Sequence, residues 1–412
     1  MSRHLGLLLA SCLGLSCSHR RDAPLSDADI VATQPKGRAS SEPYYPPPGQ
    51  WERRSPELVA MNPELVDSAI AFAKSMESTT PRDLLAAHWA SRFGREPLPK
   101  PIGPFKVRGD MTGIIVRDGY LVAEWGEPHR VDPTFSVTKS FLSSTLGVAW
   151  DRKLIPDLSA NVKDYVKTGE FDSEHNAEIT WDHLLRQTSD WQGTLWGKPD
   201  WSDRPPENVS IEEYKTRVHS EPGTTYKYND VRVNVLAFAA LQVWRRPLPQ
   251  VLKEYVMDPI GASNTWVWHG YYNSWVVIDG KRMQSVGGGA HWGGGMWISA
   301  RDLTRFGLLM LRRGKWGNKQ ILSDAWITQA LRPTKPEPTY GFMNYFLNTA
   351  TADGLRPWPN ATPNTFCHMG NGTNAVCSIP EYDIVVVARW IQDDALDGFL
   401  KRVIAAVGTK TN

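Results

Sequence analysis

The stretch Phe135-Ser136-Val137-Thr138-Lys139-Ser140 opens a run of small and apolar residues that continues through Phe-Leu-Ser-Ser-Thr-Leu-Gly-Val-Ala to Trp150. Lys139 is the only charged residue between Val137 and Trp150, and this pattern predicts a helix that is buried all round. Ser136 and Lys139 are three residues apart, so on a helix their side chains share a face and lie close enough to touch. A buried lysine must be paired or partly neutral. A neutral amine beside a serine hydroxyl is a general base beside a nucleophile.

The alternative is a chance Ser-x-x-Lys pattern on a surface helix, because that pattern is common in proteins. Two observations favour the catalytic interpretation. No other lysine of this chain has a serine three residues before it. The helix is also too apolar to present a solvated face.

Composition excludes several classes of function. The chain has 412 residues and a formal net charge of +2, so no polyanionic partner is implied. No basic cluster with interleaved aromatic residues is present, which excludes nucleic acid as an expected partner. No pair of histidines at ligand spacing is found, and we expect neither a metal nor a cofactor. The 18 tryptophans indicate either core and lid packing or an aromatic-walled cleft.

The first 17 residues predict an export signal. A short basic start precedes the apolar run Leu5 to Cys17, which is too short for a membrane span. Leu9-Ala10-Ser11-Cys12 resembles a bacterial lipobox, and Gly14-Leu15-Ser16-Cys17 is a looser version of it. We therefore expect an exported protein, periplasmic or anchored to the membrane only through lipid on Cys12 or Cys17. An ordinary secretory signal is the alternative.

Residues 18–60 are polar and proline-rich, which predicts a flexible tether between the export signal and a folded domain of residues 61–412.

The apolar patterns predict that both ends of that domain contribute to one sheet. An amphipathic helix is expected from Pro63, and a hairpin is expected over 112–125, with its turn at Asp118-Gly119. Residues 155–252 indicate helices and loops, 266–275 an irregular aromatic segment, and 302–312 a helix. Near the C-terminus we expect a hairpin about Asn371-Gly372, a third strand over 384–390 and a closing helix over 394–407. The predicted class is α+β: an antiparallel sheet flanked by helices, with an inserted, mostly helical domain.

Two cysteines occupy mirrored positions about the second hairpin turn. Cys367 precedes Asn371-Gly372, and Cys377 follows it. The two side chains are therefore expected to face each other across the hairpin, and a disulfide is reasonable in an exported protein. Two buried thiols are the alternative.

Three clusters of polar residues follow one another along the chain: Ser136-x-x-Lys139, Tyr228-x-Asp230 and His368-Met369-Gly370. Their order and spacing resemble those of the serine hydrolases related to class C β-lactamases and DD-peptidases. The resemblance covers residues 61–408. Four flanking stretches agree with it: Leu184-Leu-Arg-Gln-Thr-Ser-Asp190, Pro222-Gly-Thr-Thr-Tyr-Lys-Tyr228, Gly294-Gly-Met-Trp-Ile-Ser-Ala-Arg-Asp-Leu303 and Pro380-Glu-Tyr-Asp-Ile-Val-Val-Val387.

The resemblance implies a site between the sheet and the helical part. Ser136 would be the acylated nucleophile, and Lys139 and Tyr228 would handle its proton. A tyrosine becomes a usable base when an adjacent ammonium favours its anion. The backbone N–H groups of Ser136 and Asn371, beside Gly370, would form the oxyanion hole.

Each role has an alternative. Tyr226 is a nearby alternative to Tyr228 as the catalytic tyrosine. The spacing from Pro222-Gly223, six residues ahead of Tyr228, favours Tyr228. His368 would point into the cleft if it follows the motif, or would be a strand histidine that faces solvent.

Two positions depart from the pattern of the resembled family. Asp230 stands where asparagine is usual, and it would disfavour an anionic substrate group or pair with Lys139. His368 stands where lysine is usual and is largely neutral near pH 7. Both changes favour an esterase or amidase that acts on small neutral or amino-bearing substrates. A DD-peptidase, a β-lactamase and a catalytically silent binding protein are the alternatives.

Overall fold

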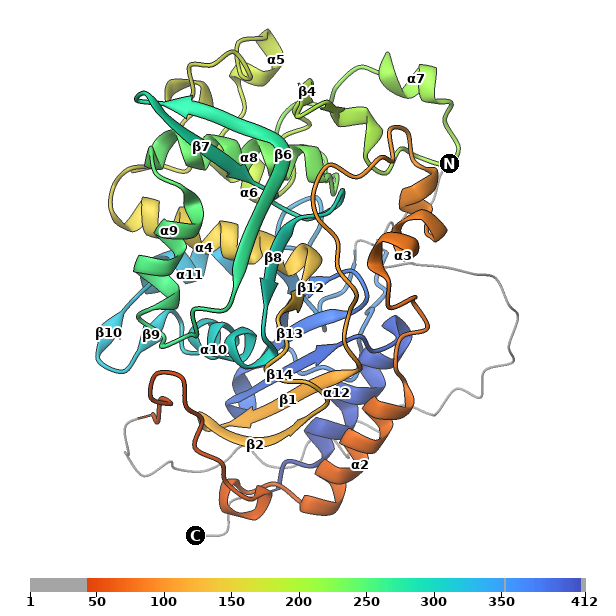
Figure 1. The fold of residues 1–412 in the computed structure, drawn as a ribbon, viewed down its shortest axis with the longest axis vertical. Helices are drawn as coiled ribbons and strands as arrows, with labels where there is room; N and C mark the ends of the chain where they lie inside the picture. The colour runs from red at the N-terminus through yellow and green to blue at the C-terminus, as the bar shows by residue number, and fades with distance from the viewer. Residues whose placement is uncertain (1–42, 352, 409–412) are drawn as a thin grey trace.

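The computed structural model of the chain describes residues 43–351 and 353–408. Its lower part in Figure 1 is a six-stranded antiparallel sheet with the strand order β11-β12-β13-β14-β1-β2. The N-terminal hairpin pairs directly with β14. The prediction that both ends of the domain contribute to one sheet is confirmed. The strands are β1 (Thr112–Arg117), β2 (Tyr120–Trp125), β11 (Tyr345–Phe346), β12 (Phe366–Gly370), β13 (Asn374–Ile379) and β14 (Ile384–Arg389).

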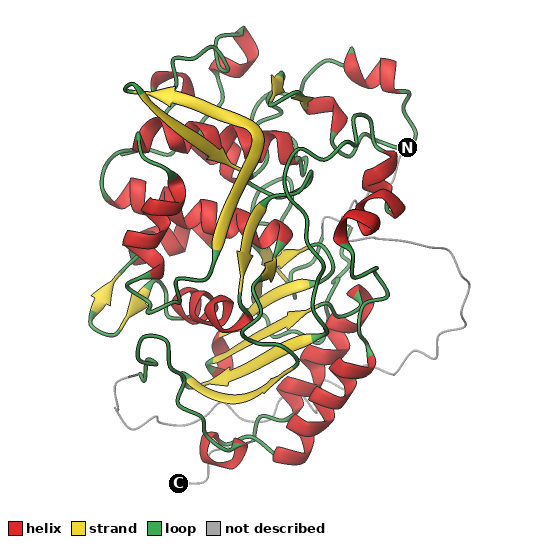
Figure 2. Ribbon diagram, in the orientation of Figure 1, coloured by secondary structure: helices red, strands yellow, loops and turns green. Residues whose placement is uncertain are grey.

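The central strands of this sheet are buried on both faces. Successive residues of β1 belong to two different cores: Ile114 and Val116 to one, and Ile115 to the other. Helices α2 (Pro63–Ser75) and α12 (Leu396–Ala405) pack against each other over one face. Helix α10 (Ala300–Leu311) covers the other face and contacts β1, β13 and β14. The α+β class is confirmed, with helices on both faces of the sheet (Figure 2).

The middle of the chain forms the helical part, as predicted. Helix α4 (Thr138–Asp151) carries the sequence that follows Ser136, and 12 of its residues are buried. It packs against α8 (Asp230–Trp244), whose first residue is Asp230. The remaining helices are short: α3 (Leu84–Ala90), α5 (Glu174–Ala177), α6 (Trp181–Leu185), α7 (Ile211–Lys215), α9 (Leu248–Leu252) and α11 (Asp324–Ala330).

A second sheet joins the two parts and differs from the prediction. Its order is β3-β8-β6-β7, and β6 takes up most of the stretch expected to be irregular. The pairing of β6 with β7 shifts between Gly270 and Trp275, which breaks the regular alternation that reveals a strand in a sequence. The strands are β3 (Asp132–Pro133), β6 (Val267–Ile278), β7 (Lys281–Val286) and β8 (Gly295–Ile298). Two short hairpins are β4 (Thr194–Leu195) with β5 (Lys198–Pro199), and β9 (Lys315–Trp316) with β10 (Lys319–Gln320).

Two of the tryptophans near α6 serve packing. Trp181 and Trp191 are 0% and 2% exposed and belong to the larger core. For these two residues the structure favours the packing alternative over a substrate wall.

The expected tether is wrong for its last part, residues 43–60. Tyr44 stacks on Tyr120 with ring centres 4.1 Å apart, and Leu121 donates to the Glu52 carbonyl at 2.9 Å. The buried guanidinium of Arg305 donates to the carbonyl of Pro46 at 3.2 Å. Each proline lacks a backbone N–H group but keeps its carbonyl oxygen. Here such carbonyl oxygens accept the hydrogen bonds of a buried arginine. The predicted export signal, with Cys12 and Cys17, lies outside the described residues.

Between residues 43 and 408, leaving out residue 352, no helix is both long and apolar enough to cross a membrane.

Cys367 and Cys377 are direct cross-strand partners in β12 and β13. A disulfide joins them, with the Cα atoms 4.2 Å apart. Both residues are buried under α12 and α2 in the smaller core. The mirrored positions in the sequence thus correspond to one rung of the hairpin.

Candidate active site

Ser136 lies at a sharp turn between β3 and α4. Phe135, the residue before it, has a φ of 47°, which non-glycine residues rarely adopt. Buried Arg389 on β14 holds the chain just upstream, because it donates to the carbonyls of Asp132 and Pro133 at 2.9 and 2.8 Å. Ser136 is half-buried, and the N–H groups of the two residues after it donate to the carbonyls of Thr134 and Phe135.

Lys139 points back at Ser136 from the first turn of α4. Its ammonium nitrogen is 2.7 Å from Ser136 Oγ, as the three-residue spacing predicts. The side chain is 1% exposed. Burial lowers the pKa of Lys139, and the attraction of Asp230 opposes that shift. The lysine is therefore placed where its neutral form can accept the serine proton.

Tyr228 is the tyrosine that reaches the pair. Lys139 Nζ lies 4.6 Å from the centre of its ring. The side chains of Ser136 and Tyr345 are close enough to the Tyr228 hydroxyl to act on its pKa. The rival Tyr226 instead packs its ring 5.2 Å from that of Tyr340. The structure thus places the Tyr228 ring, at 4.6 Å, beside Lys139.

The protonation of Tyr228 differs from the expectation. Burial and then the Asp230 carboxylate raise the pKa of Tyr228, and they outweigh the nearby Arg204 guanidinium. The phenol therefore keeps its proton near neutral pH and can donate it. Lys139 is the group better suited to accept a proton from Ser136.

Asp230 binds two cations at once. Its Oδ1 is 2.7 Å from Lys139 Nζ, and its Oδ2 is 2.7 Å from Arg204 Nη1. Burial raises the pKa of Asp230, but the charges of Lys139 and Arg204 outweigh burial and hold that pKa below its ordinary value. Asp230 also begins α8, where a negative charge is favoured by the helix dipole. The pairing with Lys139 that the sequence suggested is present.

Sequence reasoning missed a buried cluster next to Asp230. Arg204 also contacts Asp203 at 2.5 Å, and Asp203 accepts the backbone N–H of Asp230. His291 Nδ1 lies 3.7 Å from Asp203 Oδ1, and its Nε2 lies 2.7 Å from Glu96 Oε2. Arg204 and Asp230 are 26 positions apart, and Glu96 and His291 are 195 apart. Because these residues come from separate segments, no local motif contains them.

Three members of this cluster have the chemistry of metal ligands. Atoms of Glu96, Asp203 and His291 lie within 4.8 Å of one another. Each is already paired, however: Asp203 with Arg204, and Glu96 with His291. The guanidinium supplies the positive charge that the carboxylates require. We therefore assign no metal to this cluster.

Gly370 brings the end of β12 against the nucleophile. A Cβ atom there would clash with the Thr134 carbonyl and lie 2.9 Å from the Ser136 nitrogen. Only glycine allows this approach. The turn that follows begins with Asn371, so this residue lies next in sequence to the point where the chain meets the Ser136 backbone.

His368 lies buried beneath the site. It is 1% exposed, its ring centre is 5.1 Å from that of Phe306 on α10, and its Nδ1 is 2.8 Å from Ser140 Oγ. The Ser140 hydroxyl donates to the Met343 carbonyl at 2.6 Å, so it accepts from Nδ1–H of His368. Burial lowers the pKa of His368 to about 3. The solvent-facing alternative is excluded, and the ring is neutral at physiological pH.

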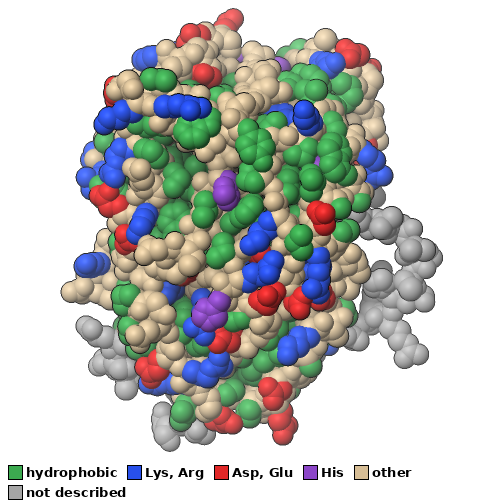
Figure 3. Space-filling view, in the orientation of Figure 1, with side chains coloured by type: hydrophobic (Ala, Val, Ile, Leu, Met, Phe, Trp, Pro, Cys, Tyr) green, Lys and Arg blue, Asp and Glu red, His purple; other side chains and the backbone are tan. Residues whose placement is uncertain are grey.

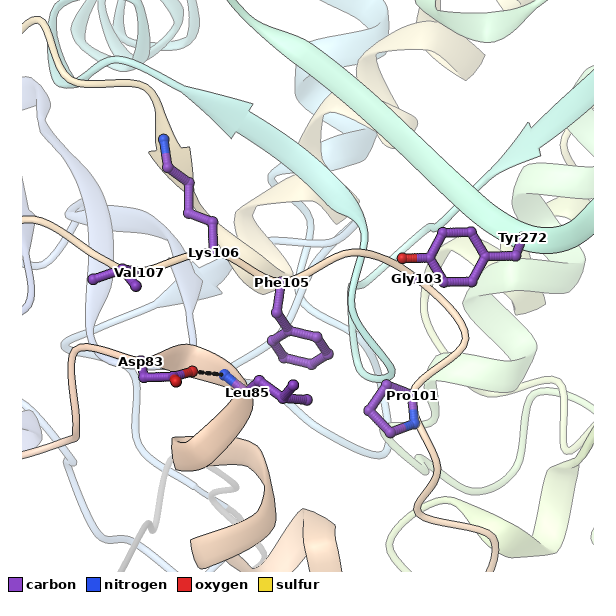
Figure 4. A pocket seen from close by; sticks show the side chains of 8 residues that line it. All are labelled: Asp83, Leu85, Pro101, Gly103, Phe105, Lys106, Val107 and Tyr272. Atoms are coloured by element: carbon purple, nitrogen blue, oxygen red, sulfur yellow. Dashed lines mark hydrogen bonds between the residues drawn. The ribbon is translucent and has the colours of Figure 1, made fainter.

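Charged and apolar side chains are interspersed over the face shown in Figure 3. A separate pocket, seen from close by in Figure 4, lies apart from Ser136. Its volume is 380 Å³, and Figure 4 shows Phe105 and Tyr272 on its wall. None of its lining residues belongs to the cluster around Ser136. The pocket is therefore separate from the cluster around Ser136 and Lys139.

A family model named beta-lactamase matches residues 106–403, which include every site residue from Ser136 to Asn371. The chain belongs to the beta-lactamase family. No curated protein matches the chain. The beta-lactamase family thus accounts for both the motif order and the two-part fold.

Solved structures share the beta-lactamase fold at low identity. A candidate beta-lactamase from Bacteroides dorei DSM 17855 is 14% identical with a TM-score of 0.52, over 72% of this chain and 92% of that one. A family VIII carboxylesterase is 17% identical with a TM-score of 0.51, over 72% and 92%. EstCE1, a hydrolase with promiscuous acyltransferase activity, is 16% identical with a TM-score of 0.52, over 83% and 98%. At these identities the similarity shows the fold.

Proposed function

We propose that this chain is a serine hydrolase that cleaves an ester or amide bond through an acyl-enzyme on Ser136. The observation that carries the proposal is the 2.7 Å contact between Lys139 Nζ and Ser136 Oγ at the start of a buried helix. A lysine whose pKa is lowered by burial is a general base of the kind that activates a serine.

The proposed reaction moves one proton at a time. Lys139 accepts the Ser136 proton while Oγ attacks the substrate carbonyl carbon and forms a tetrahedral oxyanion. Backbone N–H groups of Ser136 and Asn371 would hold that oxyanion. Tyr228 then donates its proton to the leaving alcohol or amine and recovers one from the Lys139 ammonium. Water attacks the acyl-enzyme with the same groups in reverse roles.

The charges around Ser136 favour a neutral or amino-bearing substrate. His368, at the position where the family usually has a lysine, is neutral and buried, so it offers no fixed charge to a substrate carboxylate. Asp230 adds a carboxylate to the site, although that charge is paired. These features support an esterase or amidase over a β-lactamase, whose substrates carry a carboxylate.

Export remains part of the proposal. The lipobox-like stretch before Cys12 supports an exported lipoprotein. The Cys367–Cys377 disulfide supports the same compartment, because disulfides persist in oxidising environments. The mass of the mature N-terminus from a bacterial membrane fraction tests this point directly.

The deciding experiment is intact mass spectrometry after exposure to a fluorophosphonate, a short-chain aryl ester and benzylpenicillin. We expect a fluorophosphonate adduct on wild type and on Ser143→Ala, a neighbouring serine of α4, and none on Ser136→Ala. Ester turnover without a lasting penicillin adduct supports the esterase or amidase. A lasting penicillin adduct on Ser136 supports a DD-peptidase instead. No adduct and no turnover with any probe would leave a binding protein with a hydrolase fold.

A further inference from the structure

We propose that Arg204 is a positioning residue that neutralises Asp230 and thereby leaves Lys139 able to accept the Ser136 proton. The proposal rests on the function proposed above and concerns how Lys139, the base in that reaction, is kept able to accept a proton. It also accounts for the aspartate that stands where the resembled enzymes usually have an asparagine.

The geometry divides one buried carboxylate between two cations. Asp230 is 0% exposed, and its two oxygens face different partners. Oδ1 is 2.7 Å from Lys139, which can lose its proton, and Oδ2 is 2.7 Å from Arg204, which cannot. Arg204 is itself 6% exposed and comes from a loop rather than from α4 or α8.

The physical reason is the cost of an unpaired buried charge. If Lys139 were the only partner of Asp230, loss of its proton would leave an uncompensated carboxylate in the interior. The ion pair would then hold the lysine as an ammonium. Because Arg204 keeps its charge, Asp230 retains a partner after Lys139 becomes neutral. Taken by itself, the Asp230–Arg204 pair has no net charge, so it can stand in for a neutral amide and leave Lys139 free to lose its proton; Asp203, which also contacts Arg204, weakens this effect.

Other charged groups around Lys139 modify this balance. Asp203 contacts Arg204 and offsets part of its charge, and His291 Nδ1 lies 3.9 Å from Asp230 Oδ2, with Glu96 behind it. Lys227 donates to the Arg204 carbonyl at 2.5 Å, and burial lowers the pKa of Lys227 to about 8. Tyr228 presents its ring to both Lys139 and Arg204, at 4.6 and 5.0 Å.

The two partners of the carboxylate pair should act on Lys139 in opposite directions. Burial is the largest influence and lowers the pKa of Lys139; Asp230 raises it, and Arg204 lowers it. Removal of Arg204 should therefore raise the pH at which Lys139 becomes neutral, and removal of the Asp230 charge should reduce it. A close charge shifts the pKa of a buried group by about 1 to 3 units.

The test uses Arg204→Gln, Asp230→Asn, the double variant and the charge-retaining Arg204→Lys. For each, the rate of fluorophosphonate labelling of Ser136 is measured against pH. The titration of Lys139 is followed independently through the carbon-13 shift of its Cε, assigned with Lys139→Arg. In Arg204→Gln we expect the pH at which labelling begins to rise, and the midpoint of the Lys139 titration, to increase by about 1 to 3 pH units. In Asp230→Asn we expect both to decrease. The double variant should return towards wild type, and Arg204→Lys should stay near it.

The proposal would be overturned if the Lys139 titration moved in the same direction, or not at all, in Arg204→Gln and Asp230→Asn. An arginine with a structural role alone would change the amount of folded protein and would not move the two titrations in opposite directions. If Arg204→Gln does not fold, the other two variants still test the proposal. A Lys139 titration that moves in Arg204→Lys and stays fixed in Asp230→Asn would also overturn the proposal. Failure of Ser136 to react in wild type at any pH would instead reject the proposed hydrolase. The carbon-13 titration would still report on Arg204 in that case.

Discussion

The backbone of Gly289 lies directly against the Asp230 carboxylate. A Cβ atom added at position 289 would overlap Asp230 Oδ1 and clash with Lys139 Nζ. The glycine-rich stretch that begins at Gly287 therefore forms one wall of the buried ion pair. Close approach of the backbone to Asp230 and Lys139 thus requires glycine at position 289.

Replacement of Gly289 by alanine should disable Ser136 while leaving the fold in place. The added methyl group must displace Asp230 or Lys139, and a misplacement of about 1 Å in a catalytic group costs about 100-fold in rate. We expect fluorophosphonate labelling and ester turnover to fall by about that factor. Gly287→Ala is the matched control, because its nearest neighbour would be the Gly295 nitrogen at 3.3 Å. Equal activity of the two variants would show that the ion pair tolerates displacement.

Tyr228→Phe should lose activity that Tyr226→Phe retains. The Tyr228 ring lies 4.6 Å from Lys139 Nζ and its hydroxyl is close to Ser136, and loss of a positioned proton donor costs about 100- to 10,000-fold. Both tyrosines lie in the same aromatic group with Tyr340, so packing changes in the two variants are similar. The comparison is kcat for a short-chain aryl ester, with thermal melting as the check on folding. Comparable losses in both variants would assign the effect to packing.

Local patterns predicted the parts of the fold and site that neighbouring residues determine. The contact between Ser136 and Lys139 follows from a three-residue spacing on one helix, and β1 with β2 follows from apolar runs about Asp118-Gly119. Cys367 and Cys377 face each other because positions mirrored about a short turn become partners. In each case the sequence separation is short and the geometry has few alternatives.

The rest depends on contacts that no local pattern records. Arg204 reaches Asp230 through a loop whose path is set by packing, and the same residue types elsewhere in the chain form ordinary surface pairs such as Arg245 with Asp279. Strand β6 was missed because its register shift hides the alternation. Residues 43–60 have the composition of a tether, but composition does not show that Arg305 needs their carbonyl oxygens.

His368 should make the fold sensitive to mild acid. Burial lowers the pKa of His368 to about 3, against an ordinary value near 6.5 in the unfolded chain. Below pH 6.5 the unfolded state binds a proton at this histidine and the folded state does not. The free energy of unfolding is therefore highest above that pH and decreases as the pH falls towards 3. One such group removes about 2 kcal/mol between pH 7 and pH 5.

The measurement is urea unfolding of wild type, His368→Asn and His129→Asn at pH 7 and pH 5. Asparagine at position 368 places an amide donor near Ser140 without a titrating ring, so that variant should lose about 2 kcal/mol less than wild type between the two pH values. His129 is exposed, and its replacement should leave the wild-type loss unchanged. If the losses of wild type and His368→Asn run in parallel, His368 binds its proton equally well in both states, and its neutral, buried role beneath Ser136 is refuted.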